Sequence, residues 1–176
     1  MASFPDATLV ISESEVEQVY RQLAAHLQPL VSTGNCVLVG VLMGGMIPTA
    51  RLAGMLTGDF LLDCCQVGRY RGGVKGGTLE WILTPRAALD GKTVVLVDDI
   101  YDEGITLDYV VSALLERGAS KVVSAVLIRK RHDRAKGRIR PDFVGREVED
   151  HYVFGCGMDY RHRWRHLPAI YALKDE

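Results

Sequence analysis

The chain has 176 residues, 48% hydrophobic and 24% charged, with a formal net charge of −1. These values favour one folded domain and argue against disorder or nucleic-acid binding through bulk positive charge. No apolar stretch could span a bilayer and the N-terminus shows no signal-peptide pattern, so we expect a cytoplasmic protein without a membrane partner. The cysteines form no CxxC pair or zinc pattern and are interpreted as buried thiols in a reducing compartment: Cys36, Cys64, Cys65 and Cys156.

Alternating helix and strand patterns fill the first half of the chain. Apolar residues recur on one helical face over 12–31, and Ser12 with Glu15 forms a capping-box signature at its start. Residues 68–77 contain five glycines and therefore predict a loop. The other elements predicted here are a buried strand over Cys36–Leu42, a helix over Ile47–Leu56 and a strand over Phe60–Val67.

The same alternation continues in the second half. A strand is predicted over Thr93–Val97, a helix over Ile105–Arg117 with Leu107, Val110, Val111, Leu114 and Leu115 facing inward, and a strand over Val122–Ile128. Strands that alternate with helices predict an α/β fold with a mainly parallel sheet flanked by helices. The less regular tail after about residue 129 is expected to form a small flap over one end of the sheet.

The segment 94–107, VVLVDDIYDEGITL, carries the clearest chemical signal. It predicts a buried strand that runs into two acids, a turn of residues 102–106, and then a helix. Ligands bind at the carboxyl ends of such strands, and free N–H groups at a helix N-terminus suit a phosphate. Asp98 and Asp99 lie where they can accept hydrogen bonds from sugar hydroxyls or hold Mg²⁺. An ordinary turn with helix-capping acids is the alternative.

These residues resemble the phosphoribosyl pyrophosphate (PRPP) motif of type I phosphoribosyltransferases. The resemblance implies that Asp98 and Asp99 hold the ribose, and that Asp102, Glu103, Gly104, Ile105 and Thr106 form the loop for the 5′-phosphate. It also implies that Asp102 is catalytic and handles a purine proton. Mg²⁺ is the implied cofactor, held by Asp98, Asp99 and Asp159, directly or through water.

Other motifs resemble the hypoxanthine-guanine branch of that family. Residues 42–45, LMGG, match its pyrophosphate loop, which carries a non-proline cis peptide before its second residue. Met43 stands where the branch often has lysine. Arg165 matches an arginine that helps to hold pyrophosphate. The implied pyrophosphate residues are therefore Met43, Gly44, Gly45 and Arg165.

The tail resembles the purine-binding hood of the same branch. Tyr152 occupies the position of an aromatic that stacks on the base, and Val153 meets the base edge through its backbone. Lys130 matches a lysine that faces the purine 6-oxo group, and Asp159 lies near the exocyclic group or the metal. The implied fold is the type I phosphoribosyltransferase fold, a single domain over 1–176 with a small C-terminal/N-terminal hood formed mainly by about 130–176.

The loop over 68–77 lies where type I enzymes have a catalytic lid. Arg69 and Tyr70 stand where the branch usually has Ser-Tyr, and they are the candidate lid residues. A lid of this kind closes over the reacting sugar and excludes water.

The resemblance implies a purine-salvage enzyme that joins hypoxanthine or guanine to PRPP and releases IMP or GMP together with pyrophosphate. A xanthine-preferring enzyme stays open. So does a PRPP-binding RNA regulator of pyrimidine genes, whose basis would be the basic run between Arg129 and Arg140; we interpret this run, beyond Lys130, as a solvated loop. A homodimer or homotetramer is expected, and nucleic acid is not an expected partner.

Overall fold

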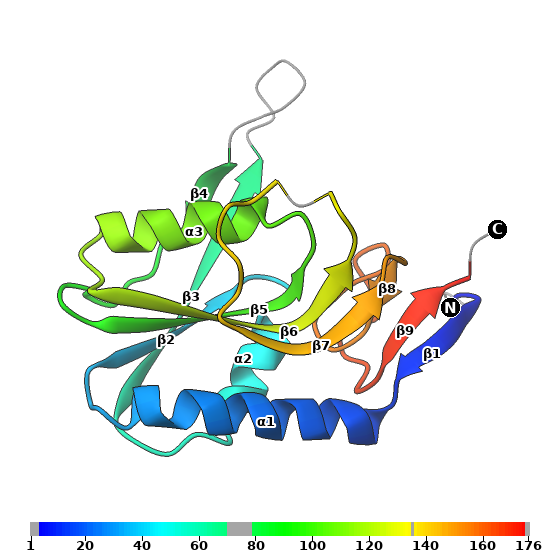
Figure 1. Ribbon diagram of the computed structural model, residues 1–176, viewed down its shortest axis with the longest axis horizontal. Helices are drawn as coiled ribbons and strands as arrows, with labels where there is room; N and C mark the ends of the chain where they lie inside the picture. Colours follow the sequence, from blue (N-terminus) through cyan, green and yellow to red (C-terminus); the bar gives the residue numbers. More distant parts are fainter. Residues whose placement is uncertain (1–3, 70–78, 135, 175–176) are drawn as a thin grey trace.

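The computed structural model describes residues 4–69, 79–134 and 136–174. Its centre is a six-stranded sheet in the order β4-β3-β2-β5-β6-β7, parallel except for β4, which pairs antiparallel with β3. Helices α1 and α2 cover one face and α3 covers the other (Figure 1). The strands are β2 Cys36–Val41, β3 Phe60–Arg69, β4 Leu79–Leu83, β5 Thr93–Tyr101, β6 Lys121–Arg131 and β7 Phe143–Glu149. The mainly parallel α/β architecture that the alternation predicted is confirmed.

The three helices begin close to their predicted starts. Helix α1, Glu13–Val31, has Ser12 as its N-cap and forms the predicted capping box with Glu15. Helix α2 spans Met46–Ala53 and α3 spans Ile105–Glu116. The inward face of α3 was predicted correctly except for Leu115, which is exposed. No helix within the described parts of the chain is both long and apolar enough to cross a membrane.

A second, antiparallel sheet brings the two ends of the chain together. It has the order β1-β9-β8, from Ala7–Ile11, Ile170–Leu173 and Val153–Phe154. This small sheet lies beyond the edge where β6 and β7 end (Figure 1). It forms the predicted flap, to which the N-terminal strand also contributes.

Several predicted boundaries were wrong, among them the ends of β3 and β6. Gly68 and Arg69 do not belong to the expected loop, because they extend β3 and pair with Glu80 and Leu79 of β4. The strand expected to end at Ile128 continues to Arg131, because its last residues pair with β7. The rest of the predicted loop, including Tyr70, lies outside the described residues.

The cysteines match the prediction in part. Cys36, Cys65 and Cys156 are buried, whereas Cys64 is only partly buried, and all four are free thiols. Burial raises the pKa of both the Cys65 and the Cys156 thiol to about 12, so neither is a nucleophile at neutral pH.

Candidate active site

A cavity of about 510 Å³ opens at the carboxyl ends of β2 and β5. Its walls include Gly44, Asp98, Asp99 and the entire turn 102–106. The predicted end of the strand at Val97 was wrong, because β5 continues to Tyr101 and both acids belong to it. The backbone hydrogen bonds of a central strand therefore fix the positions of these acids.

Asp98 and Asp99 form a pair of adjacent carboxylic acids, of which Asp98 is partly buried and Asp99 is buried. The side chain of Asp99 is almost fully buried, and Asp98 Oδ1 accepts the N–H of Asp99 at 2.9 Å. Burial, followed by the neighbouring Asp99 charge, raises the pKa of Asp98 well above its ordinary value, and burial also raises the pKa of Asp99. Two neighbouring carboxyl groups whose ionisation is unfavourable are stabilised when hydroxyl donors or a cation bind to them.

The turn 102–106 opens helix α3. Gly104 is the N-cap with φ 81°, a left-handed conformation that glycine adopts without strain. The first bond back into the helix runs from the Asp108 N–H to the Gly104 carbonyl, 3.0 Å, so the N–H groups of residues 105–107 have no partner within the helix. Such a terminus can bind an anion.

Residues 136–140 form a brace around this turn. The N–H groups of Lys136 and Gly137 donate to the Glu103 carbonyl at 2.9 and 2.8 Å. The Lys136 ammonium pairs with the Glu103 carboxylate at 2.8 Å. Further along, the Asp108 carboxylate accepts the N–H groups of residues 138 and 139 at 2.8 and 2.6 Å. The turn is thus held from outside as well as by its own helix.

The loop between β2 and α2 forms another wall of this cavity. The peptide bond between Leu42 and Met43 is cis, as expected from residues 42–45. Leu42 and Gly44 line the cavity, whereas Met43 is 45% exposed. Gly45 is buried and donates its N–H to the Val41 carbonyl at 2.7 Å.

A second cavity of about 180 Å³ adjoins the first, and the two share Asp99 and Ile100. Tyr152, one of its lining residues, is half exposed. Sequence positions far apart in the chain meet here: Asp99, Ile100, Lys130, Tyr152, Val153, Met158 and Asp159. All four residues predicted to contact the purine are in this set.

Asp159 and Arg165 form an ion pair beside this cavity. Arg165 Nη2 lies 2.6 Å from Asp159 Oδ1, and Arg165 Nη1 donates to the Gly157 carbonyl at 2.5 Å. The hydroxyl of Tyr152 donates to the Asp159 carbonyl at 3.0 Å. These contacts hold Tyr152, Asp159 and Arg165 in place beside the smaller cavity.

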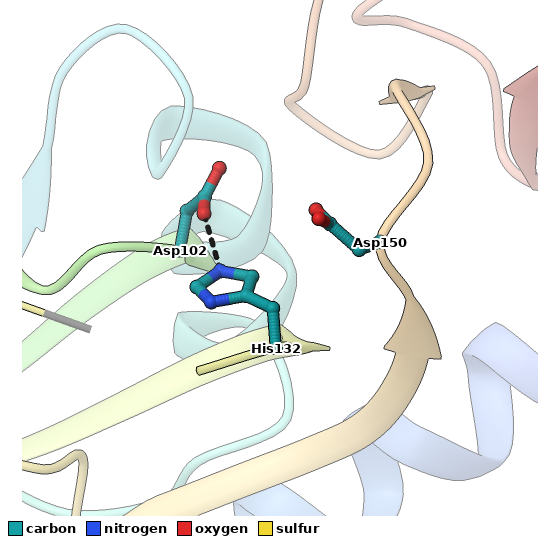
Figure 2. A group of neighbouring side chains, drawn as sticks. All are labelled: Asp102, His132 and Asp150. Atoms are coloured by element: carbon teal, nitrogen blue, oxygen red, sulfur yellow. Dashed lines mark hydrogen bonds and ion pairs between the residues drawn. The ribbon is translucent and has the colours of Figure 1, made fainter. Parts of the chain in front are cut away.

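Asp102 is surrounded by positive and polar groups. Lys130 Nζ lies 3.3 Å from its Oδ2, and His132 Nε2 lies 2.6 Å from its Oδ1 (Figure 2). Partial burial acts to raise the pKa of Asp102, but the His132 hydrogen bond and the Lys130 charge outweigh it and hold this pKa below its ordinary value. The carboxyl is therefore ionised at neutral pH.

Sequence reasoning missed His132. The available signal was the two-residue period of a strand: side chains at 130 and 132 leave the same face when β6 is prolonged. Lys130 pairs in register with Val148 of β7, and continuing this register brings His132 level with Asp150.

Beyond Lys130 the basic run is largely the exposed loop that we expected, except that Arg131 still belongs to β6. Its first three members belong to β6, and Arg131 pairs with Glu149 across the β6–β7 ladder at 2.8 Å. Arg134 pairs with Asp150 at 2.7 Å. The sequence did not indicate these ion pairs, because the acidic partners lie elsewhere in the chain and only the fold brings them close.

Only one of the two candidate lid residues lies within the described part of the chain. Arg69 is the last residue of β3, and Tyr70 lies outside the described residues.

Comparison with known proteins places the chain among related sequences. Residues 12–162 match the model of the phosphoribosyl transferase domain family. The hypoxanthine-guanine phosphoribosyltransferase of Bacillus subtilis is 32% identical over 167 residues, 94% of this chain and 92% of that protein. The protein of the same name from Lactococcus lactis is 31% identical over 172 residues, which cover 96% of this chain and 91% of that protein.

Solved structures give the same result. A hypoxanthine phosphoribosyltransferase from Staphylococcus aureus superimposes with a TM-score of 0.88 at 27% identity, covering 96% of this chain and 92% of that one. The Trypanosoma cruzi enzyme in complex with the product IMP superimposes with a TM-score of 0.86 at 25% identity, covering 99% and 98%.

Proposed function

We propose, from the membership of this chain in the phosphoribosyltransferase family and its hypoxanthine-guanine branch, that it transfers the 5-phosphoribosyl group of PRPP to hypoxanthine or guanine in purine salvage. The products are IMP or GMP and pyrophosphate. The observation that carries the proposal is the junction of two cavities at Asp99 and Ile100. One cavity is lined by the adjacent acids Asp98 and Asp99 and a helix N-terminus, and the other by a half-exposed tyrosine and a lysine.

The larger cavity is proposed to bind PRPP. The free N–H groups and the Thr106 hydroxyl at the start of α3 take the 5′-phosphate, because the helix N-terminus favours negative charge. Asp98 and Asp99 accept hydrogen bonds from the ribose hydroxyls. Gly44 and Gly45, together with Met43 and Arg165, flank the pyrophosphate.

Mg²⁺ fits the donor set of this site. Asp98, Asp99 and Asp159 offer carboxylate oxygens, the ligand type that Mg²⁺ prefers, and Asp99 and Asp159 line the same cavity. These three residues would hold the ion, directly or through its water shell. When bound, Mg²⁺ supplies positive charge that offsets the charge of the departing pyrophosphate.

The smaller cavity is proposed to hold the purine. Tyr152 stacks on the base, and the backbone of Val153 meets its edge. Lys130, only 13% exposed as a side chain, offers a donor to the 6-oxo group. A lysine donor that faces the amino group of adenine meets another donor instead of an acceptor, so the site disfavours adenine. As purine N9 forms its bond to the ribose and the bond to pyrophosphate breaks, Asp102 handles the purine proton.

The proposal is tested by following nucleotide formation from PRPP and Mg²⁺ with hypoxanthine, guanine, xanthine, adenine and uracil in parallel. Turnover with hypoxanthine and guanine is expected. Preference for xanthine would favour the xanthine-specific alternative, and turnover with adenine or uracil alone would contradict the assignment of the purine cavity. Tight PRPP binding without turnover would favour the regulator.

Assembly and location stay predictions. We expect a homodimer or homotetramer in the cytoplasm. Leu61 and Leu62 on β3 and Ile82 on β4 are exposed apolar residues at one end of the sheet, which supports an interface there. The mass of the particle in solution tests this expectation.

A further inference from the structure

His132 contacts the carboxylate of Asp102, the proposed catalytic group. The proposed reaction assigns no role to this contact. Its Nε2 lies 2.6 Å from Asp102 Oδ1, and only 7% of its side chain is exposed. In Figure 2 the imidazole points from the end of β6 directly toward Asp102. The contact is short, and the imidazole is buried although the Asp102 side chain is 40% exposed, so His132 is a fixed partner for this carboxylate.

The second ring nitrogen identifies the tautomer. The backbone N–H of Arg134 donates to His132 Nδ1 at 3.0 Å, so Nδ1 acts as the acceptor. A neutral imidazole carries one proton, which must then sit on Nε2. His132 is therefore a neutral donor to Asp102, and the backbone of its own loop enforces that state.

Asp102, His132 and Asp150 also form a candidate metal triad, since their ligand atoms lie within 4.8 Å of one another. The neighbouring charges oppose this interpretation. Lys130 Nζ lies 3.3 Å from Asp102 and 3.8 Å from Asp150, and Arg134 lies 2.7 Å from Asp150. Metal binding at Nε2 would also move the ring proton to Nδ1, where it would face the Arg134 N–H.

We propose that His132 is the positioning residue for Asp102. Its Nε2–H holds Oδ1, while Oδ2 faces Lys130, so the carboxylate keeps one orientation beside a lysine that lines the base cavity. This inference rests on the proposed role of Asp102 in handling the purine proton. His132 itself need not touch either substrate.

The test compares three variants. His132→Phe removes the donor and keeps a ring; His132→Gln keeps an N–H donor; His26→Phe, on the exposed face of α1, is the control. For His132→Phe, kcat is expected to fall about tenfold, the effect of losing one hydrogen bond to a charged group, with the Kd for PRPP within about twofold of wild type. His132→Gln should recover most of kcat. An unchanged kcat, or equal losses in kcat and PRPP affinity, would overturn the proposal.

A spectroscopic readout on the unmodified protein does not depend on activity. Imidazole ¹⁵N correlations of the substrate-free enzyme should show the Nε2–H tautomer for His132, and this signal should shift in Asp102→Asn. A proton on Nδ1 instead would refute the inference. Micromolar Zn²⁺ inhibition that disappears in His132→Phe would also refute it, because it would establish the metal triad.

Failure of this inference is distinguishable from failure of the proposed function. If Asp102→Asn keeps full turnover, the role of Asp102 is wrong, whatever His132 does. If Asp102→Asn loses turnover while His132→Phe keeps it, only the positioning role is wrong.

Discussion

Gly137→Ala tests whether the brace 136–140 controls the phosphate turn. A Cβ at Gly137 would lie 2.5 Å from the Gly104 carbonyl oxygen, 2.6 Å from its carbon and 2.9 Å from its Cα. Ordinary contacts lie near 3.5 Å, so the brace or the turn must move by about 1 Å. All three contacts are backbone atoms, and no side-chain rotation relieves them. Overpacking of this kind costs about 1–3 kcal/mol of folding stability.

The same displacement should weaken PRPP binding. Misplacement by about 1 Å typically costs up to about 100-fold, so the Kd for PRPP should rise by about 10- to 100-fold. Calorimetric titration with PRPP and Mg²⁺ measures it, and a thermal melt measures the stability loss. Gly54→Ala at the end of α2 is the control, since its Cβ would lie 3.6 Å from its nearest neighbours. If Gly137→Ala binds PRPP with wild-type affinity, the brace does not control the phosphate turn and the reasoning is refuted.

Three further substitutions separate the proposed roles. The raised folded-state pKa of Asp98 means that its ionisation costs stability, a loss that begins above the unfolded pKa and grows as pH rises toward the folded value. Asp98→Asn should therefore have a higher Tm than wild type at pH 8, and this difference in Tm should shrink toward pH 4. The same variant should lose PRPP binding. An equal or lower Tm at pH 8 would contradict the stability argument. Asp102→Asn should lower kcat by about 100-fold or more with little change in the Kd for PRPP, measured by steady-state kinetics and titration. Tyr152→Leu should raise KM for the base by about 5- to 100-fold, whereas Tyr152→Phe keeps stacking and should not.

The β5–turn–α3 unit was largely predictable because its signals are local. A buried apolar run, two acids, and a glycine before an apolar helix stand within fourteen residues. The glycine is where the chain requires a positive φ. What local signals did not give was the end of the strand, because pairing of Ile100 and Tyr101 with β6 extends it.

The small sheet was not predictable from such signals. Thr8 pairs with Ala172, and Val153 pairs with the same residue from the other side. The sequences of β1 and β9 do not indicate which strand each one pairs with, because the pairing joins opposite ends of the chain. The resemblance to a known family, rather than periodicity, pointed to a hood and to Lys130 and Tyr152 as residues of one purine site; the two line the same cavity.

The basic run bears on the remaining alternative, an RNA-binding regulator. Binding of RNA through charge depends on cations that release counterions from phosphates. Here each described basic side chain from 129 to 140 has a partner within the protein: Arg129 with Glu147, Lys130 with Asp102, Arg131 with Glu149, Arg134 with Asp150, Lys136 with Glu103, Arg138 with Asp108 and Arg140 with the Tyr101 hydroxyl.

The location of those partners explains what the run does instead. Asp102 and Glu103 belong to the phosphate turn, and Asp108 lies in the first turn of the helix that follows it. RNA bound to this segment would compete with the contacts that hold the turn in place, so PRPP and RNA should weaken each other's binding. RNA binding that weakens steeply with salt but is unchanged by saturating PRPP would contradict this assignment. If no such RNA binding is found, the basic run is assigned to supporting the phosphate turn.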